Sequence, residues 1–505
     1  MSDTVRITLQ PLGHEFTVER DTPLQDVLFT YGVEFPCGGN AICEGCKVKV
    51  LSGELEVTPE QENILSRKDV AEGWRLACRC RAEHDLTLEL AQWDAKILTD
   101  DSKFEFVPRQ GLGIAIDLGT TTIAAQLLDL ATGNVLAVET ALNEQARYGA
   151  DVMSRISFAV MEKGQNALEE TIRLQLGGMV SKLIGSAGVD GELVQDVVIV
   201  GNTVMHHLFC GFDVTPLSQY PFESPRGDLH RITARELDWI AIPNATARFL
   251  PCMGSFVGSD VLAGILATGI HRSDALVGLI DLGTNGEIVL GTRDRLLYCS
   301  TAAGPAFEGS CISMGMRATT GAIAQVKAED GSFKCRVLGN TAPKGICGSG
   351  LVDAIAVGLS AHRIRDDGKI LNSNGSLSLC PPVELSQADI RELQVAKAAI
   401  AAGVRILLKD LGATMEDVGR VHLAGAFGNY IDRSNAHRIG LLPVPPERVQ
   451  PAGNTALLGA KLSLFSAGPT PLSGIQRIAE HVALNLDEQF QDIFIGEMSF
   501  SPYAP

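Results

Sequence analysis

Apolar and polar positions divide the chain into a short first part rich in strands and a longer second part in which strands and helices alternate. In the first part, VRITL and HEFTVE alternate like the two strands of a hairpin, residues 23–32 have a helical pattern, and DLTLEL adds a further strand. Farther along, Ser386 and Asp389 form a capping-box pattern, and the apolar stripe that continues to Leu411 predicts a long core helix without chemistry of its own.

The second part contains an internal repeat. The segment GIAIDLGTTTIAAQLLDLATGN at 113–134 is matched by GLIDLGTNGEIVLGTRDR at 278–295, and VVIVGNTVMHHLF at 197–209 is matched by VHLAGAFGNYI at 421–431. Each copy is an apolar strand, a tight glycine turn with an Asp at its mouth, and another strand, followed much later by a buried strand that ends in a glycine-containing turn. Two such copies predict two α/β halves that face each other across a cleft.

Composition places the chain among acidic α/β proteins of about three domains. It has 505 residues, of which 45% are hydrophobic and 52 are glycine, and its formal net charge is −18. No apolar run approaches the roughly 18 residues that cross a membrane, and no Lys and Arg cluster suits nucleic acid, so we expect neither as a partner. The start MSDTVRITLQ lacks a signal-peptide pattern, which predicts a cytoplasmic protein whose thiols stay reduced.

Cysteines gather near the beginning of the chain. Cys37, Cys43 and Cys46 lie in the glycine-rich stretch FPCGGNAICEGCKV, and Cys78 follows after 31 intervening residues. Glycines let the backbone curl around inorganic sulfide, so this quartet suits the four coordination positions of a 2Fe-2S cluster that carries single electrons. Cys80 lies two residues beyond Cys78 and could replace it. Zinc, which favours paired short spacings, is a weaker alternative, and a disulfide framework is weaker still.

The two Asp-Leu-Gly-Thr turns suit phosphate binding. Asp117 and Asp281 are the candidate catalytic residues, because a carboxylate at the mouth of such a turn can hold a hydrated magnesium or orient a water. The glycine of each turn permits a tight bend, and the residues after it offer backbone N–H and hydroxyl donors. The candidate phosphate contacts are Gly119, Thr120, Thr121, Thr122, Gly283, Thr284, Asn285 and Gly286. One such turn is weak evidence, whereas a pair accompanied by AGAFG is strong evidence.

These motifs resemble two known folds. The segment to about residue 97 resembles a plant-type ferredoxin of β-grasp fold, and by that match Cys78 is the fourth ligand and Cys80 a bystander. The later part resembles the duplicated, ribonuclease H-like ATPase fold of actin, sugar kinases and heat-shock chaperones, with an adenosine motif at 423–428 and a closing helix at 454–461. This resemblance implies ATP and Mg²⁺ as cofactors and hydrolysis coupled to cleft closure. The adenosine contacts it implies are Gly425, Ala426 and Gly428.

The order of the two parts, together with STAAGPAFEG, KGICGSGLVDAI and VHLAGAFGNYID, resembles the reductive activators of corrinoid proteins over about residues 3–500. The resemblance implies an ATP-hydrolysing iron-sulfur oxidoreductase that passes one electron to the cob(II)amide of a methyl-carrying corrinoid protein and so restores cob(I)amide. A low-potential electron donor would act upstream, and a homodimer is left open. Unlike some members, the chain has no extra domain after the linker, and unlike others it has no cysteine motif after Cys380.

Two alternative functions remain open at this stage. One is an ATP-dependent activator of another low-potential enzyme, such as a radical dehydratase, and the complete cysteine quartet counts against it. The other is a non-redox chaperone or assembly ATPase with a ferredoxin-like docking module. An intact redox-active cluster would count against that second alternative.

Motifs and changes of composition set the predicted domain boundaries. A polar stretch at 98–111 reads as a linker that would let the first domain swing, unless its Phe and Val residues dock on a neighbouring surface. The predicted units are a ferredoxin domain at 1–97, the linker at 98–111, a first ATPase lobe at 112–272, a second at 273–467 and a C-terminal extension at 468–505.

The remaining histidines and cysteines are expected to be structural. His206 and His207 follow the first glycine turn, and they lack His or carboxylate neighbours at metal-binding spacing. Cys311 and Cys347 are expected to be small buried residues.

Overall fold

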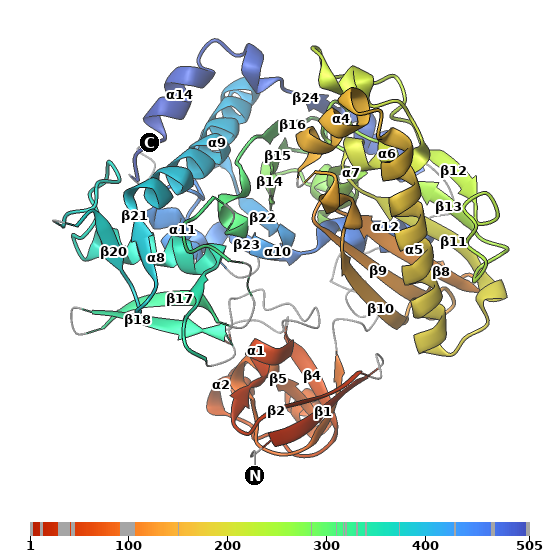
Figure 1. Ribbon diagram of the computed structural model, residues 1–505, viewed down its shortest axis with the longest axis horizontal. Coiled ribbons are helices and arrows are strands. Elements are labelled where there is room, and N and C mark those ends of the chain that lie inside the picture. The colour runs from red at the N-terminus through yellow and green to blue at the C-terminus, as the bar shows by residue number, and fades with distance from the viewer. Residues whose placement is uncertain are drawn as a thin grey trace.

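The computed structural model places a small N-terminal domain beside two larger lobes (Figure 1). The N-terminal domain is drawn in red and orange, the first lobe mainly in yellow and the second from green to blue. The structure describes residues 4–10, 14–28, 41, 46–90, 107–149, 151–283, 285–309, 311–316, 318, 321–329, 332–338, 341–372, 374–428, 431–465 and 470–500.

The N-terminal domain is a five-stranded sheet of order β2-β1-β7-β4-β5. In β1, alternate apolar side chains are buried against the domain core, as a half-buried strand requires. Strand β1 pairs antiparallel with β2 and parallel with β7, which gives the β-grasp arrangement expected from the sequence. The elements are β1 Thr4–Gln10, β2 His14–Glu19, α1 Leu24–Leu28, β4 Lys47–Ser52, α2 Pro59–Ile64, α3 Arg67–Ala71, β5 Trp74–Leu76, the 3-10 turn η2 Ala77–Arg79 and β7 Leu86–Leu90.

Each lobe is built on a six-stranded sheet, and the two sheets have corresponding topology. The first has order β10-β9-β8-β11-β13-β12, and the second β16-β15-β14-β22-β23 with β24 beyond β16. In each, an antiparallel three-stranded meander is followed by two parallel strands, so the internal repeat seen in the sequence is a structural duplication. The strands are β8 Leu112–Leu118, β9 Thr122–Asp129, β10 Val135–Leu142, β11 Val194–Val200, β12 His230–Thr233, β13 Thr246–Phe249, β14 Val277–Leu282, β15 Gly286–Gly291, β16 Leu296–Thr301, β22 Arg420–Ala424, β23 Val449–Gly453 and β24 Ala479–His481.

Helices cover these sheets and two of them join the lobes. Helix α9 begins with the capping box of Ser386 and Asp389 and buries its apolar stripe, which confirms the predicted core helix. Helices α7 and α12 pack together where the lobes meet, and a Cβ on Gly459 of α12 would lie only 2.1 Å from the carbonyl oxygen of Ala263. The helices are α4 Val152–Met161, α5 Gln165–Ala187, α6 Thr203–Cys210, α7 Ser259–Thr268, α8 Gly348–Ser360, α9 Gln387–Leu411, α10 Gly425–Gly428, α11 Arg433–Arg438, α12 Thr455–Phe465, α13 Thr470–Ile478 and α14 Phe490–Gly496.

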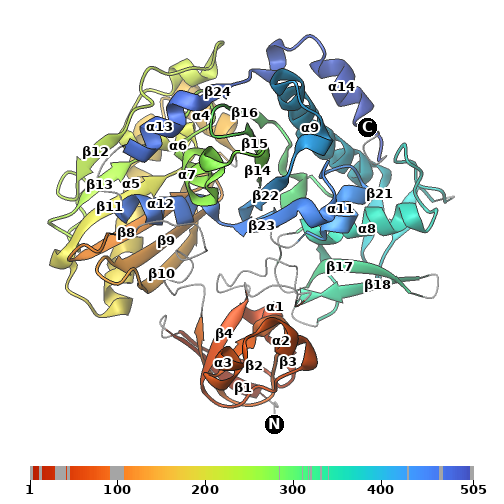
Figure 2. The ribbon, with the colours of Figure 1, turned by 180° about the vertical axis from the view of Figure 1, so that it is seen from behind.

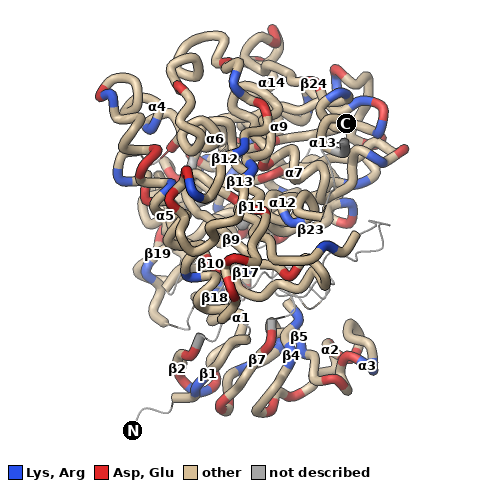
Figure 3. Tube along the Cα trace, turned by 90° about the vertical axis from the view of Figure 1, so that its right-hand side faces the viewer, with Lys and Arg blue, Asp and Glu red and all other residues tan. Residues whose placement is uncertain are grey.

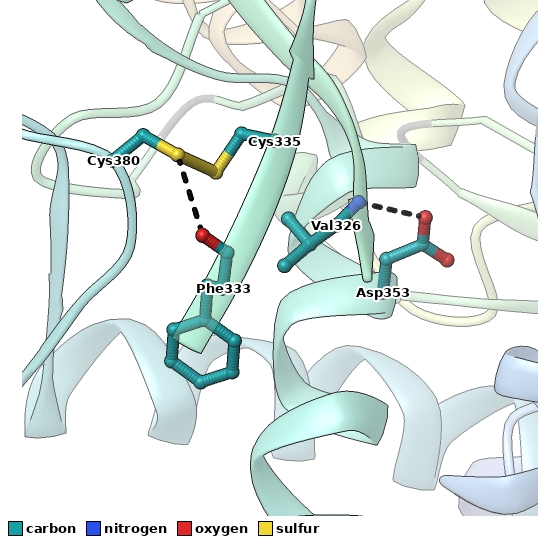
Figure 4. The surroundings of a disulfide bond; sticks show 5 residues. All are labelled: Val326, Phe333, Cys335, Asp353 and Cys380. Atoms are coloured by element: carbon teal, nitrogen blue, oxygen red, sulfur yellow. Dashed lines mark hydrogen bonds between the residues drawn. A yellow bond between two sulfur atoms is a disulfide. The ribbon is translucent and has the colours of Figure 1, made fainter. Parts of the chain in front are cut away.

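The second lobe carries a hairpin of β17 (Ala322–Glu329) and β18 (Ser332–Val337), followed by β19 (Gly345–Ile346). A disulfide joins Cys335 of β18 to Cys380, with 6.3 Å between their Cα atoms (Figure 4). The expectation that the thiols stay reduced is therefore wrong at this pair. The two cysteines are 45 residues apart, and only the packing of β18 against the segment after β20 (Ser376–Ser378) brings them together.

The helices and the charged residues bear on the expectations about membrane and nucleic-acid partners. No helix in the described ranges is long and apolar enough to cross a membrane. Figure 3 shows Lys and Arg positions interspersed with Asp and Glu along the described chain.

Most of the predicted linker lies outside the described residues, but its last part is fixed by hydrogen bonds. Arg109 donates hydrogen bonds to the carbonyl oxygen of Leu464 on α12 and to Asp196 of the first lobe.

Candidate functional site

The first candidate phosphate turn follows β8, where Asp117 is half-buried near the strand's end. Side chains of the first lobe hold the carbonyl oxygens of this turn. Asn143 donates to the carbonyl of Gly119 over 2.9 Å, and Arg155 donates to that of Thr120 over 2.6 Å. Because the buried Arg155 side chain is committed to this turn, the loop is held by the lobe and keeps its shape without a ligand.

A second contact ties the turn to the strand-to-helix junction of β11 and α6. The side-chain amide of Asn202 donates to the hydroxyl of Thr120 over 2.8 Å, and the same side chain caps α6 by accepting from the N–H of Met205. The junction approaches its neighbours closely, since a Cβ on Gly258 would lie 2.1 Å from the carbonyl oxygen of Gly201. The buried glycine turn predicted from the sequence repeat therefore packs beside the first phosphate turn.

The second candidate turn follows β14 and carries Asp281. The N–H of Gly283 donates to the carbonyl of Asn285 over 3.0 Å, which closes the bend, and the hydroxyl of Thr301 donates to the carbonyl of Gly286. Thr284 lies outside the described residues. The first glycine of the expected adenosine motif lies directly against this turn: Gly425 has φ +85°, and a Cβ there would be 2.6 Å from Oδ1 of Asp281.

The carboxyl groups at the two phosphate turns are half-buried and influence one another. Burial raises the pKa of Asp117 to about 6 and that of Asp281 to about 7, and the charge of Asp117 adds to the second shift. Carboxyl groups that raise one another's pKa suit a divalent cation, which would offset their negative charge.

Two further carboxyl groups belong to this cleft, and the sequence analysis did not find them. Asp260 begins α7, and its pKa is raised to about 7 by burial, with Asp117 and Asp281 adding to the shift. Glu287 lies on β15 directly opposite Asp281 in the antiparallel register, and burial raises its pKa well above the usual range. Like charges in a cross-strand pair are destabilising. Two acidic residues placed symmetrically on either side of a tight turn, as Asp281 and Glu287 are, were therefore the sequence signal that could have revealed Glu287.

The closing helix expected from the sequence reaches the first phosphate turn. Asn454, just before α12, donates from Nδ2 to Oδ2 of Asp117 over 2.8 Å, and its side-chain oxygen accepts from the N–H of Leu457. This one residue therefore caps α12 and hydrogen-bonds a catalytic candidate 337 positions earlier in the chain.

Two of the four candidate cluster ligands lie in the described part of the N-terminal domain. Cys46 is buried just before β4, and Cys78 lies in η2; the carbonyl of Cys46 accepts from the N–H of Ala77, so the two segments are adjacent. Cys37 and Cys43 lie outside the described residues. Cys80 is buried, and its thiol lies 3.3 Å from the carbonyl oxygen of Leu76.

Burial raises the pKa of Cys80 to about 12, with the nearby Cys78 contributing. Metal ligation needs the thiolate, and Cys78, which is less buried than Cys80, stays the predicted fourth ligand.

Three of the four histidines and cysteines expected to be structural are buried. His206 and His207 are fully buried on α6, and Cys347 is buried at the start of α8. The expectation for Cys311 was wrong, because this thiol is exposed in a turn at φ +65°. Within the described ranges, no three His, Cys, Asp or Glu side chains already form a metal site.

Comparison with protein families matches this architecture in three consecutive stretches. Residues 7–83 match the 2Fe-2S iron-sulfur cluster binding domain, residues 112–273 the RACo middle region, and residues 275–504 the C-terminal domain of RACo, the ASKHA domain. The fold and the site thus define an iron-sulfur oxidoreductase whose ferredoxin domain is fused to an actin-like ATPase fold.

Relatives agree along most of the chain. The corrinoid activation enzyme RamQ of Eubacterium limosum is 36% identical over 419 residues, 77% of this chain and 70% of that protein. The Co(II) methylated amine-specific corrinoid protein reductase of Methanosarcina barkeri is 29% identical over 425 residues, 77% of each chain. A solved reductive activator for corrinoid, iron-sulfur protein is 28% identical, covers 98% of both chains and superposes with a TM-score of 0.70. The chain belongs to the RACo family of reductive activators of corrinoid proteins.

Proposed function

We propose that this chain reduces the cob(II)amide of a corrinoid methyl-carrier protein to cob(I)amide, one electron at a time, and that ATP hydrolysis in the cleft between the lobes assists the transfer. The observation that carries the proposal is the fusion itself: a ferredoxin domain and a duplicated ATPase fold lie in one chain that matches a solved corrinoid activator along 98% of its length. The alternatives of a radical-dehydratase activator and of a non-redox assembly ATPase have no such full-length support among these matches.

The electron would be held in the N-terminal domain by Cys37, Cys43, Cys46 and Cys78. A plant-type 2Fe-2S cluster, when bound, supplies one electron at about −400 mV. Each electron delivered to cobalt(II) leaves the cluster oxidised by one electron, so an upstream low-potential donor must return it. Cys80, whose thiol lies 3.3 Å from the carbonyl oxygen of Leu76, would stay outside the ligand set.

The ATP would lie between the two phosphate turns, with the adenosine near α10. Asp117 and Asp281 would hold a hydrated magnesium ion, because their carboxyl groups are near enough to raise the pKa of Asp281. Magnesium, when bound, neutralises charge on the β- and γ-phosphates. Asp260 lies in the first turn of α7, and the charges of both Asp117 and Asp281 act on it. It would accept a proton from the attacking water.

The coupling would use one contact between the lobes, Asn454 with Asp117, and one inside the second lobe, Gly425 with Asp281. Asn454, between β23 and α12, hydrogen-bonds Asp117 of the first phosphate turn. Gly425, which follows β22, lies against Asp281 of the second phosphate turn. Closure of the lobes on ATP would tighten the Asn454–Asp117 contact. The energy is needed because each further 59 mV or so of uphill transfer costs about a factor of ten, or about 1.4 kcal/mol.

The test follows cob(I)amide absorption when reduced protein is mixed with a cob(II)amide-loaded corrinoid protein, with and without ATP. Wild-type protein should need ATP, and Asp281→Asn should lose both ATP hydrolysis and reduction. Cys78→Ala should lose reduction while it keeps hydrolysis. Asp353→Asn is the matched control, because Asp353 is a buried carboxyl group whose pKa is also raised to about 7 but whose partners lie outside the cleft.

Equal reduction by wild-type protein with and without nucleotide would remove ATP from the electron-transfer step and bring the assembly-factor alternative forward. Loss of hydrolysis in Asp353→Asn as large as in Asp281→Asn would show that any buried carboxyl group matters to the fold, and the cleft assignment would fail.

A further inference from the structure

The ferredoxin domain makes an ion pair with the second lobe. Asp26 of α1 accepts a hydrogen bond from Nη2 of Arg336 on β18, across 310 residues of sequence. The Asp26 side chain is 1% exposed, whereas Arg336 is 32% exposed. Figure 2 shows α1 on the face of the domain that is turned toward the lobes, near one end of the β17–β18 hairpin. The contact is therefore built from a buried carboxylate on one domain and a more accessible guanidinium on the other.

The contact lies on the cluster side of the ferredoxin domain. Helix α1 packs against η2, the turn that carries Cys78, and the N–H of Leu24 donates to the carbonyl of Cys80 over 2.9 Å. Docking through α1 therefore turns the side of the domain that carries Cys78 toward the second lobe.

The hairpin that receives α1 is fixed to its own lobe at two points (Figure 4). Cys335, the residue before Arg336, is joined by the disulfide to Cys380. On the partner strand, the N–H of Val326 donates to the buried carboxylate of Asp353 on α8 over 3.2 Å. Because both strands are anchored, Arg336 is presented at a fixed place instead of on a loose arm.

The contact is specific without being strong. Burial raises the pKa of Asp26, and the attraction of Arg336 offsets this only in part. The second carboxylate oxygen of Asp26 is buried without a hydrogen-bond partner. Buried ion pairs often contribute little net free energy while a like-charge replacement is strongly unfavourable. Such a pair selects one orientation of the domain and still allows it to leave.

We propose that the β17–β18 hairpin is a docking surface for the chain's own ferredoxin domain, on which Asp26 and Arg336 hold the cluster side against the ATPase and away from large electron acceptors. The inference rests on the proposed function in one respect, since it takes the N-terminal domain to hold a redox-active cluster. It adds that the domain has a docked position, in which a corrinoid protein cannot reach the cluster, and a released one, in which it can.

The experiment compares wild-type protein with Arg336→Glu, which sets two carboxylates against each other. Lys334→Glu is the matched control, because Lys334 lies on the same strand with 69% of its side chain exposed and pairs with Glu329 of the hairpin itself. Each protein is reduced, freed of reductant and mixed with cytochrome c, so that one electron leaves the cluster and haem iron(III) becomes iron(II). Ferricyanide serves as the small acceptor, and X-ray scattering gives the radius of gyration.

We expect Arg336→Glu to reduce cytochrome c several-fold faster and to have a larger radius of gyration, with the ferricyanide rate unchanged. Arg336→Lys, which keeps the charge, should stay near wild type, as should Lys334→Glu. Equal cytochrome c rates and equal radii in wild type and Arg336→Glu would overturn the docking proposal. Neither readout uses a corrinoid protein or ATP, so failure here is distinct from failure of the proposed function.

Discussion

Removal of the Asn454 side chain should shift the pH dependence of ATP hydrolysis. Asn454 donates to Oδ2 of Asp117 over 2.8 Å, and this bond lowers a pKa that burial has raised to about 6. A hydrogen bond to a charged group contributes about 1.5–3 kcal/mol, and about 1.36 kcal/mol corresponds to one pKa unit. Asn454→Ala should therefore raise the pKa of Asp117 by about one to two units.

The direction of the effect follows from which form of Asp117 is active. The proposed magnesium site uses the carboxylate, so activity is present above the pKa and is lost as pH falls through it. A higher pKa in the variant moves the acid limb of the rate profile toward alkaline pH by a similar amount. Because Asp260 and Asp281 also titrate in this cleft, the limb reports the coupled group and not Asp117 alone.

The assay is steady-state ATP hydrolysis from about pH 5.5 to about pH 9, with kcat and kcat/KM fitted separately. Asn454→Ser retains an oxygen that can cap α12 but is too short to reach Asp117, so it separates loss of the cap from loss of the bond. Asn435→Ala is a second control, because Asn435 donates to the buried Asp353 over 2.7 Å. An acid limb that stays in place in both Asn454 variants would refute the role given to this hydrogen bond.

Three further outcomes are expected. Cys78→Ala should abolish the visible and paramagnetic signals of the 2Fe-2S cluster and Cys80→Ala should retain them, and the reverse result would exchange the two ligands. Gly425→Ala should lose ATP binding in calorimetry, because its Cβ would meet Asp281 at 2.6 Å, while Gly412→Ala, with no atom within 4 Å of its Cβ, should keep it. Cys335→Ser should lower the free energy of unfolding of the second lobe by about 4 kcal/mol, the value for a closed loop of 45 residues; an unchanged denaturation midpoint would contradict this.

The ferredoxin domain and the duplication of the lobes could be predicted from the sequence, because each depends on patterns that span only a few residues. Alternation in β1 and β2, the capping box of α9 and the glycine turns after Asp117 and Asp281 are each legible within a few residues. The match of strand orders between the two lobes then follows, because equal segments in equal order fold into equal sheets.

Long-range pairings could not be derived in this way. Asp260 becomes part of the cleft only because α7 packs between the lobes, and no motif around it marks a carboxylate. The Cys335–Cys380 disulfide and the Asp26–Arg336 pair join segments that are 45 and 310 residues apart. Such partners are set by how elements pack, and a single sequence contains no periodic signal for them.

Helix α12 connects two places that otherwise share nothing. Just before the helix, Asn454 donates a hydrogen bond to Asp117 at the first phosphate turn. Near its end, the carbonyl of Leu464 accepts a hydrogen bond from Arg109, which lies in the last part of the predicted linker. An 11-residue helix is a stiff rod about 16 Å long. Because α12 also packs on β8 and β11, it joins the first phosphate turn and the Arg109 attachment point into one rigid unit with the first lobe. We expect the attachment point of the ferredoxin domain to follow this unit in any movement of the lobes.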